Sequence, residues 1–146
     1  MVQSNVFSPN AMRSQPEAHE PGGPADYLLD TDRRLVTVKF RNKVTVSDIA
    51  RYAASLRTNP LFEPDFSEIV DMSEVEELDL KAEEFIRLAD NIDPFSQQAR
   101  RAFVARDSVQ NHAARMHKIL RTQKNIAIFS SVEAAQRWIE TQLATP

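Results

Sequence analysis

The sequence has no cysteine, which excludes disulfides, thiol nucleophiles and thiolate metal ligands. Its 146 residues include only two glycines, Gly22 and Gly23, and none follows them. Phosphate-binding loops and dinucleotide fingerprints need glycines, because the backbone must turn tightly and approach the phosphates closely. We therefore expect no nucleotide site of the usual kinds and no cofactor.

Long apolar runs and a strong net charge are also missing. No stretch approaches the roughly 20 apolar residues of a membrane helix, and the first residues lack the basic and apolar segments of a secretory signal. The net charge of −3 favours neither nucleic acid nor a membrane surface as a partner. These absences predict a cytoplasmic protein with no membrane span and no nucleic-acid partner.

Proline and glycine are concentrated at the start of the chain. Residues 1–25 hold four of the eight prolines, both glycines and few large apolar side chains. Such a segment cannot bury enough surface to offset the entropy lost on ordering it. We expect residues 1–25 to be a disordered leader and residues 26–146 to form a single domain.

Strand-like and helix-like patterns alternate through the predicted domain. Residues 27–29 and 35–40 flank a polar turn and predict an antiparallel hairpin. Further strands are expected at 66–72, 102–105 and 126–129, each followed by a helix. Residues suited to the start of a helix are Thr45, Asp79, Asp107 and Ser130. The expected fold class is α/β, with a mixed sheet of about five strands and about four helices packed over it.

Helical spacing also predicts which side chains face the core. The inward stripe expected for the second helix comprises Ala82, Phe85, Ile86 and Ala89. The inward stripe expected for the third helix comprises Val109, Ala113, Met116 and Leu120, and the one expected for the last comprises Val132, Ala135, Ile139 and Leu143.

The run EIVDMSEV at residues 68–75, taken with this order of elements, resembles the STAS domains (sulfate transporter and anti-sigma antagonist). The similarity is greatest to the SpoIIAA-like bacterial proteins of unassigned function, also described as STAS/SEC14-like. The closing run FSSVEAAQRWI at 129–139 is similar to the end of many such domains. The resemblance covers residues 26–143 and implies a SpoIIAA-like fold.

Anti-sigma antagonists carry a phosphorylatable serine directly after an aspartate at the start of the second helix. Here Leu80 follows Asp79, so the resemblance does not imply a phosphorylation switch at that position. Ser73 lies earlier in the same loop. Its position does not make it a substitute for the antagonists' serine, and Ser73 and Asp79 are candidates only for an interaction site.

Charged residues and histidines suggest surface roles. His112 and His117 are five residues apart, whereas ligands on one helical face are three or four apart, so both are expected to be solvent-exposed. Ten carboxylates lie between residues 63 and 84, and seven basic residues lie between 100 and 124. We expect no metal site, and we expect these acidic and basic surfaces to meet across a protein interface.

Aromatic residues offer two further candidate sites. Leu61, Phe62, Phe66 and Phe95 lie in loops that precede strands, and they form either a satellite core, an apolar ligand pocket or a dimer contact. Trp138 lies about 100° from Ile139 on the last helix, outside the expected inward stripe. It serves either as an interface anchor or as a cover over the sheet edge.

Two functions follow from this sequence. The leading prediction is a non-enzymatic protein-interaction or regulatory module that self-associates as a homodimer. The alternative is a carrier of a small apolar or lipid-like ligand, suggested by the SEC14-like part of the resemblance and by the loop aromatics. A closed apolar cavity of ~300 Å³ or more favours the carrier, whereas an exposed apolar patch favours the interaction module. An enzyme ranks third, because no catalytic motif is recognisable.

Overall fold

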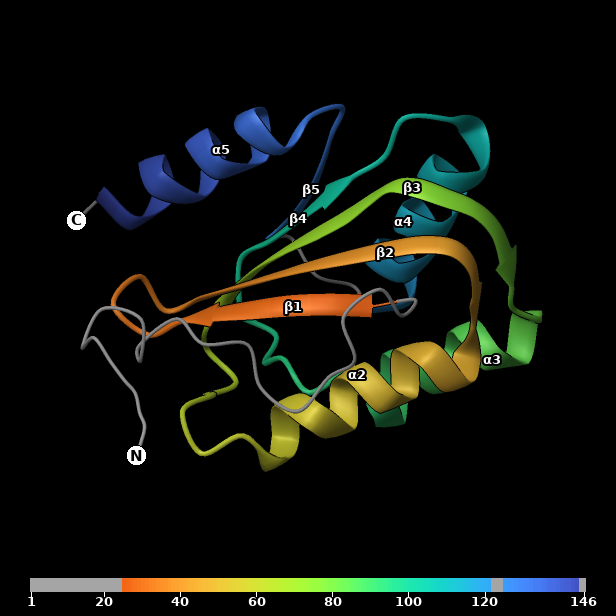
Figure 1. Cartoon of the computed structure of the whole chain (residues 1–146), viewed down its shortest axis with the longest axis horizontal. Coiled ribbons are helices and arrows are strands. Elements are labelled where there is room, and N and C mark those ends of the chain that lie inside the picture. Colours follow the sequence, from red (N-terminus) through yellow and green to blue (C-terminus); the bar gives the residue numbers. More distant parts are fainter. Residues whose placement is uncertain (1–24, 122–124, 145–146) are drawn as a thin grey trace, which may run out of the picture.

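The structure, a computed structural model, describes residues 25–121 and 125–144, and they form one five-stranded sheet covered by helices (Figure 1). The strands lie in sequence order, with the first pair antiparallel and the others parallel. They are β1 (Ala25–Asp30), β2 (Leu35–Thr45), β3 (Ser67–Asp79), β4 (Arg101–Val104) and β5 (Ile126–Phe129). The described helices are α2 (Val46–Thr58), α3 (Ala82–Arg87), the π-helix η1 (Leu88–Ile92), α4 (Ser108–Arg121) and α5 (Val132–Ala144). The predicted α/β fold class and order of elements are confirmed. The expected leader falls almost entirely outside the described residues.

The helices divide unequally between the two faces of the sheet. Helix α5 packs alone on one face, whereas α2, α3 and α4 lie on the other (Figure 1). Alternate residues of each strand point to opposite faces, so the sheet supports two cores. The core under α5 is small and includes Ile69, Val104 and Ile139. The larger core, on the opposite face, is where a cavity can form.

Helix α2 begins where the sequence predicts. Thr45 is its N-cap and accepts a hydrogen bond from the Asp48 backbone, while the Asp48 side chain accepts one from the Thr45 backbone. This reciprocal capping box satisfies two backbone donors at the helix start. The helix ends at Asn59, before Pro60, because a residue before proline avoids the helical region.

Strands β2 and β3 are longer than predicted, and their pairing is irregular at the far end. Lys39 pairs with Asp71 and Arg41 with Glu74, so β3 uses three steps where β2 uses two, and a second shift follows Asn42. Extra residues of this kind bend a strand and increase its twist. Both strands therefore curve toward α2 and α3 at this end (Figure 1).

The starts of two later helices differ from the prediction. Asp79 is the last residue of β3, and Lys81 is the N-cap of α3. The Ser131 hydroxyl, rather than that of Ser130, accepts the hydrogen bond from the Ala134 backbone at the start of α5. For α4 the prediction is correct, because the Asp107 carboxylate accepts from the backbone of the third residue of the helix.

Two predicted inward stripes are wrong in part. Ala82 and Ile86 of α3 are exposed, the latter to 49%, and Val109 of α4 is 52% exposed. In α4 the buried face is rotated by one residue, because Gln110 is buried and donates its side-chain amide to the Val75 carbonyl. Ala113 is buried as predicted, whereas the Ala89, Leu120 and Leu143 side chains lie outside the described part of the structure.

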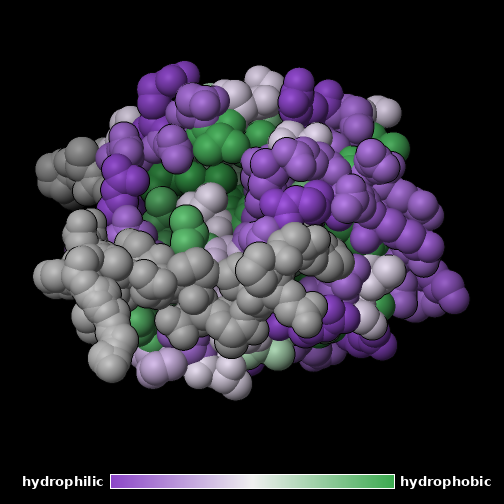
Figure 2. Space-filling model, viewed as in Figure 1, coloured by the Kyte–Doolittle hydropathy of each residue, from purple (hydrophilic) through white to green (hydrophobic). Residues whose placement is uncertain are grey.

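The surface is mostly hydrophilic, with one apolar hollow in the view of Figure 2. Hydrophobic side chains come to the surface between α5 and the strands, and hydrophilic residues border them (Figure 2). Within the described residues, no helix has both the length and the hydrophobicity to cross a membrane.

The backbone of Asn42 gives a test of the strand irregularity. Asn42 is solvent-exposed and has φ of 63°, a left-handed conformation that asparagine and glycine tolerate better than other residues. We expect Asn42→Val to lower the free energy of unfolding by about 1–2 kcal/mol, measured by urea denaturation. Asn42→Gly is the control and should be neutral or stabilising. Equal stability of the two variants would contradict the left-handed backbone at this position.

Candidate functional site

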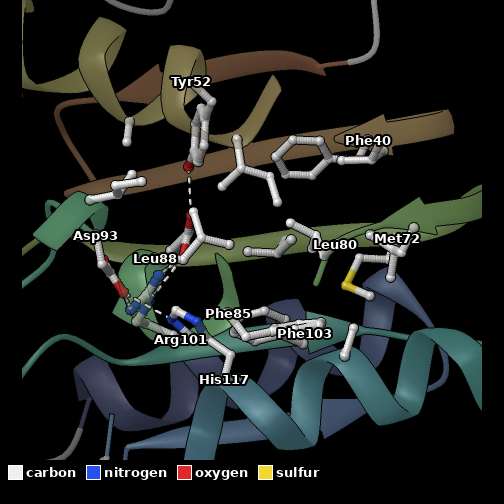
Figure 3. Close-up of a pocket in the computed structure, with 18 of the residues that line it drawn as sticks. Phe40, Tyr52, Met72, Leu80, Phe85, Leu88, Asp93, Arg101, Phe103 and His117 are labelled. Atoms are coloured by element: carbon white, nitrogen blue, oxygen red, sulfur yellow. Dashed lines mark hydrogen bonds and ion pairs between the residues drawn. The ribbon is translucent and has the colours of Figure 1, made fainter. Parts of the chain in front are cut away.

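A cavity of about 100 Å³ lies between the sheet and the helices α2, α3 and α4. Its walls are mostly apolar and come from β2, β3, β4, α2, α3, η1 and α4 and from the loops next to them (Figure 3). The apolar residues that Figure 3 labels are Phe40, Met72, Leu80, Leu88, Phe85 and Phe103. The curved ends of β2 and β3 add Val44, Val75 and Leu78, so the strand irregularity shapes one end of the cavity.

A buried ion pair forms part of the opposite end. Glu68 of β3 and Arg101 of β4 are neighbours in the parallel register, and both side chains point to the α2–α4 face. The Arg101 Nε atom donates to Glu68 Oε1 at 2.9 Å, and Nη2 approaches the same oxygen at 2.8 Å. The Glu68 side chain is only 1% exposed and the Arg101 side chain only 5%. The register of two adjacent strands therefore fixes a fully buried pair of opposite charges.

A second carboxylate, that of Asp93, binds the same guanidinium. Arg101 Nη1 donates to Asp93 Oδ2 at 2.5 Å, and the Asp93 side chain is 3% exposed. The π-helix η1 immediately precedes Asp93, whose backbone N–H donates to the Leu88 carbonyl five residues earlier. The Arg57 side chain from α2 also donates to backbone carbonyls of η1 at Asn91 and Ile92. An irregular turn of helix, anchored to α2, therefore places Asp93 opposite Arg101.

Tyr52 of α2 and His117 of α4 also contact these carboxylates. Together with Glu68, Asp93 and Arg101 they form what we call the polar cluster. The Tyr52 hydroxyl donates to Glu68 Oε2 at 2.6 Å, and His117 Nε2 lies 2.9 Å from Asp93 Oδ2. The prediction that His117 is solvent-exposed is wrong, because its side chain is 15% exposed and its ring lies 5.8 Å from that of Phe103. His112 is exposed as expected.

Burial and the neighbouring charges act against each other in this cluster. Burial raises the pKa of Asp93, but the Arg101 guanidinium and the His117 hydrogen bond outweigh it and hold that pKa well below its usual value. Burial lowers the pKa of Arg101, yet Glu68 and Asp93 raise it further, above its usual value. Burial, followed by the charge of Glu68, raises the pKa of Tyr52 well above its usual value. At neutral pH Asp93 and Arg101 are therefore charged, and Tyr52 keeps its proton.

The loop aromatics named from the sequence come together, but only one of them lines the cavity. The Phe62 ring lies 5.8 Å from that of Phe66 and 5.2 Å from that of Phe95, in edge-to-face contacts. Phe95 lines the cavity, and the centre of its ring lies 4.6 Å from the Cζ atom of Arg101. Phe66 is buried beneath the loops, and Leu61 is 47% exposed.

The candidate interaction residues lie outside the polar cluster. Ser73 donates its hydroxyl to Asp71 at 2.7 Å, and Asp79 forms an exposed ion pair with Lys43 at 3.8 Å. Leu80, at the position where the antagonists have serine, lines the cavity. Trp138 is partly buried, and its ring lies 5.7 Å from that of Phe129 on the edge strand β5.

The acidic and basic segments partly neutralise one another within the chain. Glu68 belongs to the acidic segment and Arg101 to the basic one, and they meet in the core. Glu74 pairs instead with Lys39 of the adjacent strand, at 2.7 Å. Among residues 25–121 and 125–144, no group of three or more histidine, aspartate or glutamate side chains is placed to hold a metal ion.

None of the five members of the polar cluster was predicted from the sequence as part of a site. Tyr52 fits the helical spacing of Ile49 and Leu56, and His117 lies four residues after Ala113, so their inward positions could have been inferred. Glu68 and Arg101 carry no such signal, because their contact depends on the register between two strands.

Comparisons with known proteins identify the fold. No protein-family model and no curated protein matches the sequence. Among solved structures, the chain is similar to an uncharacterised protein of the DUF3478 family with a SpoIIAA-like fold, from Shewanella loihica PV-4. The TM-score is 0.53 and the sequence identity 18%, and the match covers 72% of this chain and 83% of that one. The chain therefore has the SpoIIAA-like fold that the sequence resemblance implied.

Removing the charge of Asp93 tests the cluster. The folded-state pKa of Asp93 is depressed, so its ionised form stabilises the fold fully above the unfolded-state pKa of about 3.9, and less as the pH falls below it. We expect Asp93→Asn to lower the free energy of unfolding by about 3 kcal/mol near pH 6, because it breaks a buried pair. The difference from wild type should shrink near pH 2.5. Denaturant titrations at both pH values measure it, and an unchanged difference would contradict an ionised Asp93 in the folded state.

Proposed function

We propose that this domain binds a small, mostly apolar molecule in the cavity between the sheet and α2, α3 and α4. The observation that carries the proposal is the cavity itself. Protein interiors are packed with few voids larger than a water molecule, and this void has about 100 Å³. Its combination of apolar walls with a few convergent polar groups is typical of small-molecule sites.

The energetics of an empty cavity support an occupant. A core cavity costs about 24 cal/mol per Å³, so the observed 100 Å³ costs about 2 kcal/mol when it is empty. A ligand that fills the space with apolar atoms recovers part of this cost as binding free energy. The buried charges add to the cost of the site, since burying a charge is unfavourable even when it is paired.

The cavity volume restricts the size of the ligand. Sites for drug-sized molecules begin at about 300 Å³, and the cavity has about a third of that. An apolar cavity of about 150 Å³ is sufficient to bind benzene. The cavity has about two thirds of that volume in the described conformation, so the proposed ligand has at most about one ring, needs some widening of the site, and is not a long lipid chain.

Helix α3 is the proposed entrance. It has only six residues, and none of its side chains is buried. Phe85 of α3 and Leu80 just before the helix nevertheless line the cavity. Segments with few buried contacts open at low free-energy cost, so displacement of α3 admits a ligand without unfolding the sheet.

Self-association is a second proposal, supported by one exposed residue. Leu28 lies on the edge strand β1 and is 49% exposed. Its neighbours Tyr27 and Leu29 point into the large core, so Leu28 points to the other face of the sheet, the face on which α5 lies. Exposed apolar side chains on an edge strand favour pairing with a second chain.

Filling the cavity tests the ligand site. Ala53 lies on the cavity side of α2, and Ala54 is exposed on the opposite side of the same helix. We expect wild-type protein to bind benzyl alcohol with a dissociation constant of about 1 mM or below, equivalent to about −4 kcal/mol, measured by NMR titration. Ala53→Leu should weaken binding at least tenfold, whereas Ala54→Leu should leave it unchanged. Equal binding by both variants would place the ligand elsewhere.

A pair of leucine variants tests self-association. Leu28 and Leu61 are similarly exposed, at 49% and 47%, but only Leu28 lies on the edge strand. We expect sedimentation at micromolar concentration to show a dimer for wild type and for Leu61→Lys, and a monomer for Leu28→Lys, because an edge lysine opposes strand pairing. A wild-type monomer at every concentration would end this proposal.

A further inference from the structure

The polar end of the cavity offers hydrogen-bond acceptors to a ligand, and this property selects the ligand's chemistry. Within the described residues, the charged side chains of the cavity wall are the carboxylates of Glu68 and Asp93 and the guanidinium of Arg101, besides the titratable His117. Two carboxylates therefore face one permanent cation. A bound anion adds a third negative charge beside two largely buried carboxylates, where repulsion between like charges is stronger than in bulk water.

Glu68 has an unused acceptor position beside the cavity. A carboxylate has about four acceptor positions. Glu68 uses three: Oε1 contacts two nitrogens of Arg101, and Oε2 accepts one hydrogen bond from Tyr52. Glu68 lines the cavity and is 1% exposed, so bulk water has little access to the remaining position on Oε2.

The Tyr52 hydroxyl, a neutral donor on the cavity wall, already donates to Glu68. The hydroxyl proton of Tyr52 points to Glu68 Oε2, at an O–O distance of 2.6 Å (Figure 3). The raised pKa of Tyr52 keeps that proton in place. What the hydroxyl offers to a ligand is the lone pair of its oxygen. Tyr52 and Glu68 together therefore accept hydrogen bonds from a ligand and have no matching donor for a carboxylate.

Aromatic rings line the space next to these acceptors. Phe40 and Tyr52 are in edge-to-face contact at 5.7 Å, and Phe103 lies on the other side of the cavity (Figure 3). The face of an aromatic ring attracts a cation, most strongly where water is excluded. Carboxylates beside aromatic rings favour a positively charged group that carries N–H donors.

From this arrangement we propose that the ligand is a small apolar amine, whose ammonium group donates to Glu68 Oε2 while its apolar part fills the cavity toward Met72 and Phe85. This inference rests on the proposed ligand-binding function and goes one step further, to the class of ligand. The ammonium group supplies a positive charge that balances the excess of two carboxylates over one guanidinium, and its N–H groups can donate to Glu68 Oε2. A carboxylic acid of the same size is rejected, since its charge matches those of Glu68 and Asp93.

Three compounds of equal size and different charge test the inference. Benzylamine, benzyl alcohol and benzoate are titrated into the full chain near pH 7.5 in 0.15 M salt, with binding followed by calorimetry and NMR. Benzylamine should bind at least threefold more tightly than benzyl alcohol and at least tenfold more tightly than benzoate. Ala53→Leu should abolish this preference, which separates the cavity from general attraction of cations to an acidic protein.

Two variants of the polar end test whether Glu68 causes the preference for benzylamine over benzyl alcohol. Glu68→Gln keeps the shape of the side chain and removes its charge, so the ratio of benzylamine to benzyl alcohol affinity should fall to about one. Tyr52→Phe removes the hydroxyl and frees a second position on Glu68, so the same ratio should rise, and this variant provides the test if Glu68→Gln does not fold. An unchanged ratio in folded Glu68→Gln, or a lower ratio in Tyr52→Phe, overturns the inference.

The outcomes also separate this inference from the proposed function. If benzoate binds most tightly, or if benzyl alcohol equals benzylamine, the cavity is a ligand site but the assigned ligand class is wrong. If none of the three compounds binds wild type more tightly than Ala53→Leu, the proposed ligand-binding function itself is wrong.

Discussion

Arg101 is the residue on which the arrangement of the large core depends. Its guanidinium is buried with almost no contact with solvent, so it requires partners of opposite charge. Those partners come from β3 through Glu68 and from the segment after η1 through Asp93. Tyr52 and His117 then bind the two carboxylates from α2 and α4. One buried cation thereby fixes the relative positions of two strands, two helices and a loop, through contacts that are directional rather than merely apolar.

A network of this kind contributes less to stability than its short distances suggest. Replacing a buried ion pair with apolar residues of similar volume is often neutral or stabilising, because desolvation offsets the attraction between the charges. The same core face also contains a cavity of about 100 Å³, which well-packed side chains would fill. The buried charges and the cavity both lower the stability of the fold, and they lie side by side. The proposed ligand would contact both the apolar walls and the polar end, and would therefore account for both features.

Backbone irregularities bring the cavity and the cluster together. At one end, extra residues in β3 bend the β2–β3 pair so that Val44 and Val75 reach the cavity. At the other end, the π-helix η1 adds a residue to the turn before Asp93 and directs its carboxylate toward Arg101. Bulges and π-turns are common next to functional sites, because they re-aim a side chain that a regular element would point elsewhere. Neither feature has a clear sequence signature, and both were missed in the sequence analysis.

The fold could be predicted from the sequence, whereas the site could not, and the reason is physical. The order of the elements and the starts of α2 and α4 follow from local patterns, such as the Thr45–Asp48 capping box. The site depends on contacts between residues far apart in the chain, such as Glu68 with Arg101, which only the strand register determines. Similarity to a SpoIIAA-like structure at 18% identity extends to the fold alone.

Leu80 illustrates the difference between sharing a fold and sharing a site. By the sequence resemblance, it occupies the position where the antagonists have a phosphorylatable serine, and in this chain it lines the cavity. A serine hydroxyl there would place a polar group in this wall, whereas the leucine side chain adds apolar surface to the cavity. The fold therefore does not determine the chemistry at this position, which depends on the side chain that the sequence places there.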